Sequence, residues 1–119
     1  MKTLKLILTF PLGVFMILGG VNHFLTPEIY YPFIPDFLPQ AGSNYLAGVL
    51  EIILGIGVFI PAYRRFFALG ILALMVFFLP LHIWDIFRTH PAIGSHSLAV
   101  VRLPIQGVFI FWAWFIARS

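Results

Sequence analysis

Residues 66–87, FFALGILALMVFFLPLHIWDIF, decide the fold class, because polar side chains occur only near the end of this apolar run. A transmembrane helix needs about 20 mostly apolar residues. The chain holds four such windows, at about 4–25, 44–61, 66–87 and 98–117. With 61% hydrophobic residues, 9% charged residues and a mean hydropathy of +1.04, a soluble domain is excluded. We therefore predict one all-α transmembrane domain over residues 1–119, an integral membrane four-helix bundle.

The basic residues indicate topology rather than nucleic-acid binding, because they are few and lie mainly at span ends. Those on the predicted inner side are Lys2, Lys5, Arg64, Arg65 and Arg118. The loop before the second span carries only acidic charges, Glu28 and Asp36. We therefore expect both termini to be cytoplasmic and the lipid bilayer to be the main partner, with no nucleic acid.

The loop over residues 26–39, TPEIYYPFIPDFLP, is unusually apolar and contains four prolines. Proline prevents a long helix, and aromatic side chains suit the membrane interface. We expect this loop to fold back over the outer mouth of the bundle. It would serve either as an interfacial anchor or as a lid over a binding site.

Seven polar residues interrupt the apolar spans, and all lie in the outer half of the predicted bundle. They are Asn22, His23, Glu51, His82, Asp85, Arg102 and Gln106. Spacings of i,i+3 and i,i+4 place the last four on one face of their respective helices. Because an unpaired charge at bilayer depth is costly, we expect Glu51, Asp85 and Arg102 to meet across the bundle.

This polar layer has two interpretations, which the residues leave open. It either locks helix packing or forms a site that binds a ligand or handles protons. For a site, the candidates for acid or base are Glu51, Asp85 and His82, and Trp84 would supply an aromatic wall. The predicted ligand-binding set is Asn22, His23, Glu51, His82, Trp84, Asp85, Arg102 and Gln106. The chain has no cysteine and no dense metal-binding motif, so we predict neither thiol chemistry nor a metal site.

Four segments together resemble the DoxX family of small bacterial membrane proteins. They are Gly19-Gly-Val-Asn-His-Phe24, Glu51-Ile-Ile-Leu-Gly55, Pro61 with Arg64, and Arg102-Leu-Pro-Ile-Gln106. The resemblance implies a four-helix bundle in the bacterial inner membrane. Family members are linked to quinone reduction, thiosulfate oxidation and membrane redox complexes, although cysteine-dependent relatives offer no guide to this chain.

Three functions follow as hypotheses. In the first, the protein is an accessory of a membrane redox system and binds a quinone-like head group through His23, Glu51, Arg102 and Gln106, with the redox centre in a partner protein or in the ligand. The second is binding or isomerisation of a hydrophobic small molecule, by architectural similarity to the EXPERA proteins. The third is a structural subunit whose polar layer serves packing only, and whose small exposed residues permit a homodimer.

Overall fold

The computed structural model describes residues 2–118, and these are all-helical, as the sequence predicts. The four α-helices are α1 (Lys2–Leu25), α2 (Gln40–Gly57), α3 (Arg64–Ile86) and α4 (His96–Ala117). Short 3-10 helices lie in the connections: η1 (Pro27–Ile29), η2 (Tyr31–Phe33) and η3 (Pro61–Tyr63).

Three of the predicted spans agree with α1, α3 and α4 to within two residues at each end. The second differs, because α2 begins and ends four residues before the predicted 44–61 span. Pro39 directly precedes this helix in an extended conformation, and turns after Gly57 lead the chain to Pro61. Hydropathy marks apolar residues rather than helix ends. The predicted span therefore left out the polar first turn of α2 and included the apolar residues that follow the helix.

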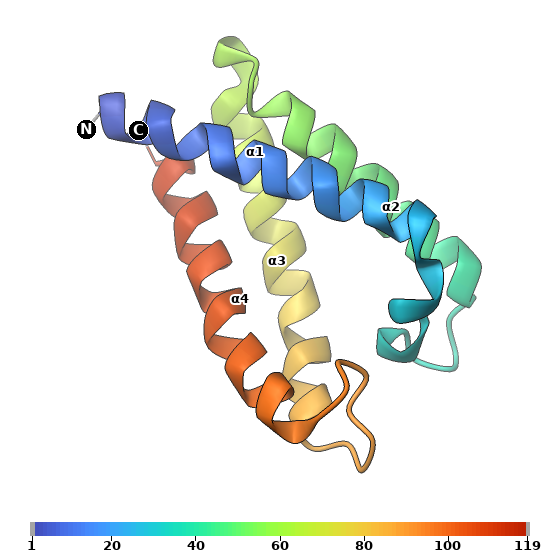
Figure 1. Cartoon of the computed structure of the whole chain (residues 1–119). Helices are drawn as coiled ribbons and strands as arrows, with labels where there is room; N and C mark the ends of the chain where they lie inside the picture. Colours follow the sequence, from blue (N-terminus) through green and yellow to red (C-terminus); the bar gives the residue numbers. More distant parts are fainter. Residues whose placement is uncertain (1, 119) are drawn as a thin grey trace.

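The helices associate as two antiparallel pairs, α1 with α2 and α3 with α4 (Figure 1). Glycines allow the first pair to approach closely. A Cβ atom on Gly20 would lie 2.6 Å from the carbonyl oxygen of Gly48, and one on Gly55 would lie 2.9 Å from that of Gly13. Within each helix the two glycines are seven residues apart, about two turns, so they recur on one face. Small residues at such positions let helix backbones pack directly against each other.

The two pairs meet at the end of the molecule that carries both termini and diverge toward the other end (Figure 1). The shared end is held by an apolar core that includes Leu12, Met16, Ile71 and Ile116. In addition, the indole Nε1 of Trp112 donates a hydrogen bond of 2.9 Å to the carbonyl oxygen of residue 8. The diverging end contains the connection over residues 26–39 and the α3–α4 connection.

The outward faces of the helices are strongly apolar. Phe10, Phe66 and Phe111 are each more than 60% exposed. Three helical segments are long and apolar enough to cross a membrane: α1, Pro61–Ile86 and α4. The second helix, α2, falls outside this group, since its first turns contain Gln40, Ser43 and Asn44.

Candidate functional site

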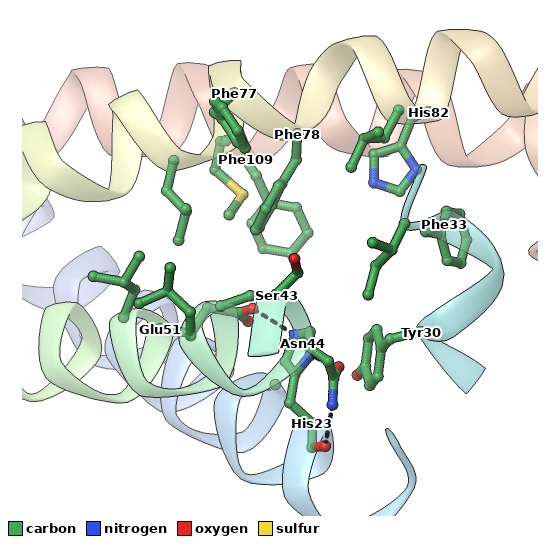
Figure 2. Close-up of a pocket in the computed structure, with 18 of the residues that line it drawn as sticks. His23, Tyr30, Phe33, Ser43, Asn44, Glu51, Phe77, Phe78, His82 and Phe109 are labelled. Atoms are coloured by element: carbon green, nitrogen blue, oxygen red, sulfur yellow. Dashed lines mark hydrogen bonds and ion pairs between the residues drawn. The ribbon is translucent and has the colours of Figure 1, made fainter. Parts of the chain in front are cut away.

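A cavity of about 630 Å³ lies between the two helix pairs at their diverging end. Its wall is mostly apolar and draws on all four α-helices and on the loop over residues 26–39 (Figure 2). Phe77, Phe78 and Phe109 line it from the α3–α4 pair, while α1 and α2 contribute most of its polar atoms. Its size and composition are those of a small-molecule site, in which a few polar groups converge on an otherwise hydrophobic space.

Four of the eight predicted ligand-binding residues line this cavity: His23, Glu51, His82 and Arg102. They come from α1, α2, α3 and α4 respectively, so each helix contributes one. The structure thus brings these four side chains to one cavity, whereas the other four predicted residues do not line it.

The imidazole of His23 joins α1 to α2 through two side-chain contacts. Its Nε2 lies 2.7 Å from Oε2 of Glu51, and its Nδ1 lies 2.6 Å from Oδ1 of Asn44 (Figure 2). The amide nitrogen of Asn44 donates to the backbone carbonyl of residue 23 at 2.8 Å, so the other amide atom must be the oxygen, which accepts. Nδ1 of His23 is therefore protonated. One further proton then lies between Nε2 and the Glu51 carboxyl group, and the pair carries no net charge whichever partner holds it.

The second carboxylate oxygen of Glu51 remains available to the cavity. Within residues 2–118, the carboxylate makes its one side-chain contact through Oε2. Gly19 provides space for Oε1, because a Cβ atom at that position would lie 2.9 Å from this oxygen. Oε1 of Glu51 can therefore accept a hydrogen bond from a ligand. The contacts of His23 with Glu51 Oε2 and with Asn44 hold the carboxylate in place.

The loop over residues 26–39 forms one wall of the cavity, as expected if it folds over a site. The Tyr30 ring stacks on the His23 ring, with centroids 3.8 Å apart and an interplanar angle of 20°. Asn22 holds this tyrosine in place, because its amide nitrogen donates to the Tyr30 hydroxyl at 2.8 Å. Thr26 in turn donates to the Asn22 oxygen at 2.9 Å. Asn22 thus positions the loop and does not line the cavity.

The predicted meeting of Glu51, Asp85 and Arg102 is wrong. Asp85 is buried and turns away from the cavity, where its carboxylate accepts hydrogen bonds from the backbone N–H groups of Ala92 and Ile93. It also lies 3.7 Å from the Arg88 guanidinium, an i,i+3 contact. Asp85 lies in the last turn of α3, next to the α3–α4 connection, so these local contacts hold its carboxylate. Its role is to stabilise the α3–α4 connection.

Arg102 lines the cavity, and no carboxylate among residues 2–118 forms an ion pair with it. Its side chain is half-buried, and Nη1 is fully buried with no hydrogen-bond partner among the described residues. The guanidinium carbon lies 5.9 Å from the centroid of the Phe109 ring, a distance that permits a cation–π interaction. His82 faces the loop over residues 26–39. Its ring lies edge-on to the Phe33 ring, with the two centroids 5.6 Å apart.

The two remaining predicted residues are structural in this arrangement. Gln106 is completely buried between α3 and α4, where its amide nitrogen donates to the Met75 carbonyl oxygen at 2.7 Å. Trp84 is 42% exposed and stacks under the Arg88 guanidinium at 4.4 Å. Residues at i,i+4 point about 40° apart around a helix, enough for Arg102 to reach the cavity while Gln106 reaches a neighbouring helix.

Sequence reasoning missed Asn44 and did not assign Tyr30 a partner. Asn44 could have been found, because it precedes Glu51 by seven residues and so lies on the same face of α2. Tyr30 gave no such signal, since its position depends on how a proline-rich loop folds. Among residues 2–118, no three histidine, aspartate or glutamate side chains are grouped as ligands for a metal ion.

Fold and site together define an all-helical chain with apolar outer faces and a cavity between two helix pairs. Residues 12–117 match the model of a family described as a domain of unknown function, DUF8561, and the chain belongs to that family. Comparison with the curated proteins and with the solved structures gave no match. The family description assigns no activity, so the resemblance to the DoxX family stays a prediction.

Proposed function

We propose that this chain is a four-helix integral membrane protein that binds a lipophilic small molecule in the cavity between its helix pairs. The observation that carries the proposal is the cavity itself. It is lined by aromatic and aliphatic side chains, with His23, Glu51, His82 and Arg102 as polar groups at its wall. If the helices associated for packing alone, they would be expected to close over this space, because protein interiors are close-packed and contain few voids.

Membrane insertion is supported by the apolar faces of α1, α3 and α4. Because α2 packs antiparallel along α1, it would cross with them and place its polar first turns at the headgroup level. The start of α1 and the end of α4 lie at the same end of the molecule as the start of α3, which carries Arg64 and Arg65 (Figure 1). In the proposed orientation this basic end faces the cytoplasm of a bacterial cell, and the cavity opens toward the outer side.

The absence of cysteine from the chain allows a direct test of this topology. Phe37 is 84% exposed in the first loop, and Tyr63 is 59% exposed in the second connection. In intact cells, a membrane-impermeant maleimide is expected to label Phe37→Cys and to label Tyr63→Cys only after lysis. Labelling of both positions from outside would contradict membrane crossing, and the reverse pattern would invert the orientation.

A quinone-like ligand, with the protein as an accessory of a membrane redox system, remains one candidate. Arg102 and His82 line the same cavity and can donate hydrogen bonds to carbonyl oxygens. An isomerase-like role is the second candidate. It is favoured by Glu51, whose Oε1 is available to the cavity while His23 shares a proton with Oε2. This pair could accept a proton from a ligand and return it. Asp85, tied to the α3–α4 connection, takes no part in either candidate.

Filling the cavity tests ligand binding, and the chain offers a matched control. Ala47 lines the cavity from α2, whereas Ala73 is exposed on α3. The wild-type protein and an Ala73→Phe variant, purified in mild detergent, are expected to retain the same lipophilic molecules. In Ala47→Phe we expect at least about tenfold less, because the ring occupies the ligand's space. Mass spectrometry of the organic extract measures this and reports whether a quinone is present.

Equal retention by both phenylalanine variants, or no co-purifying molecule in the wild-type protein, would contradict the proposed binding function. The melting temperature of each variant is measured in parallel. An Ala47→Phe variant that melts near the wild-type temperature shows that the loss of ligand is not a loss of fold.

A further inference from the structure

The acidic residues of the chain can be accounted for completely. There are four: Glu28, Asp36, Glu51 and Asp85. Glu28 and Asp36 are exposed in the first loop and do not line the cavity. Asp85 is bound to the α3–α4 connection and to Arg88. Glu51 shares one proton with His23 and forms a pair of zero net charge. No acidic side chain is therefore left to balance Arg102.

The Arg102 guanidinium thus brings a full positive charge to an apolar cavity. A charged group at such a place is costly unless it is paired or hydrated. Its buried Nη1 lacks a hydrogen-bond partner among the described residues, which adds to that cost. A guanidinium remains charged at any pH at which a protein folds, so this charge is permanent.

The rest of the cavity wall indicates what else the ligand must carry. Phe15, Leu50, Phe77 and Phe78 line it from three helices, and its volume of about 630 Å³ accommodates much more than a head group. An inorganic anion would leave this apolar wall without contacts. A ligand with both an anionic head and a hydrocarbon tail satisfies Arg102 and the wall together.

Resting on the proposed binding function, we propose that the cavity takes an anionic amphiphile, whose carboxylate or phosphate head is held by Arg102. Both groups present paired oxygens that match the forked guanidinium. The tail packs among the phenylalanines. The His23–Glu51 pair has no net charge, so it does not balance the positive charge of Arg102. A ligand with a neutral head group, such as a quinone, would not balance this charge either. Free fatty acids and single-chain phospholipids both combine such an anionic head group with a hydrocarbon tail.

Two pairs of probes test this proposal. Oleate is compared with methyl oleate, which has the same chain without the charge, and oleoyl lysophosphatidate is compared with mono-oleoylglycerol. Binding to the full-length protein in detergent is measured by native mass spectrometry at a pH where the heads are ionised. We expect at least one anion to bind roughly tenfold to a hundredfold more tightly than its neutral counterpart. The anion with the larger preference identifies the carboxylate or the phosphate as the natural head group.

Variants then assign the preference to Arg102. In Arg102→Gln we expect the anion to lose its advantage while the neutral probe binds as before, and in Arg102→Lys an intermediate preference. Arg65→Gln, at the opposite end of the molecule, is the matched control and keeps the wild-type preference. The wild-type comparison needs no variant, so it tests the proposal even if Arg102→Gln fails to fold.

The outcomes separate this inference from the function on which it rests. If neutral and charged probes bind the wild-type protein equally, the anionic head group is wrong and the lipophilic cavity stands. If none of the four probes binds and no lipophilic molecule co-purifies, both proposals fail. A preference for anions that survives in Arg102→Gln would overturn the assignment to this arginine.

Discussion

Replacing Gly20 with alanine is expected to separate α1 from α2 and to destabilise the protein by about 1–3 kcal/mol. The added Cβ would lie 2.6 Å from the carbonyl oxygen of Gly48 and 3.0 Å from the backbone nitrogen of Ile52. Both contacts are with backbone atoms of the facing helix, so no side-chain rotation relieves them. The free energy of unfolding, measured by titration with a denaturing detergent, reports the loss.

Gly107 on α4 provides the matched control for this substitution, because a Cβ atom there meets nothing within 4 Å. Gly107→Ala is expected to leave stability unchanged or to raise it by up to about 1 kcal/mol, since alanine favours helices over glycine. The same chemical change in two helices then isolates the α1–α2 contact. Equal effects of the two alanines would show that the close approach of the first pair does not contribute to stability.

The separation of α1 from α2 should also weaken the candidate site. His23 lies three residues after Gly20, and its contacts with Glu51 and Asn44 both cross the same helix interface. A shift of a few tenths of an ångström lengthens hydrogen bonds of 2.6 and 2.7 Å, which depend steeply on distance and angle. Ligand retention is therefore expected to fall in Gly20→Ala and to stay unchanged in Gly107→Ala.

The all-helical fold could be predicted from sequence because it depends on the length of the apolar runs. Hydropathy located α1, α3 and α4 almost to their ends. It misplaced α2 by one helical turn, because Gln40 and Asn44 are polar but helical while Phe59 and Ile60 are apolar but outside the helix. The close packing of α1 against α2 depends on glycine contacts between the two helices, which the pattern of a single helix does not reveal.

The candidate site was harder to predict, for a reason that Glu51 illustrates. Charge alone favours Arg102 as its partner, because that pair is fully ionised. The structure instead pairs Glu51 with His23, since Gly20 and Gly48 bring α1 directly against α2. Arg102 lies on the other helix pair, across the cavity. Periodicity predicts which residues share a face of one helix, whereas the partner across an interface depends on which helices pack most closely.

Replacing His23 with alanine is expected to produce the largest loss of stability at a single polar side chain, about 3–5 kcal/mol. Glu51 is only 8% exposed, and its carboxylate has no other side-chain partner among the described residues. The substitution would also leave the side-chain oxygen of Asn44 without its donor. Two buried polar groups would then lack partners at once. The detergent titration used for the glycine variants measures this loss.

Glu51→Gln should behave very differently, because the geometry fixes the protonation of the imidazole. Nδ1 of His23 carries a proton for Asn44, so Nε2 of the neutral ring is an acceptor. A glutamine amide can donate to Nε2 from the same place, and we expect a cost below about 1 kcal/mol. The double variant His23→Ala with Glu51→Gln should be more stable than His23→Ala alone, because no buried charge remains. Strictly additive losses would show that the two side chains do not act as a pair.

The stable Glu51→Gln variant also separates packing from proton handling. Glutamine keeps the hydrogen bond to His23 and the shape of the cavity wall, but it cannot accept or release a proton. If the polar layer serves packing alone, this variant retains every property of the wild-type protein. A proton-handling site instead predicts normal ligand retention together with the loss of any turnover of the bound molecule. Mass spectrometry of the molecules retained by the two proteins distinguishes these results, because an unprocessed ligand would accumulate only in Glu51→Gln.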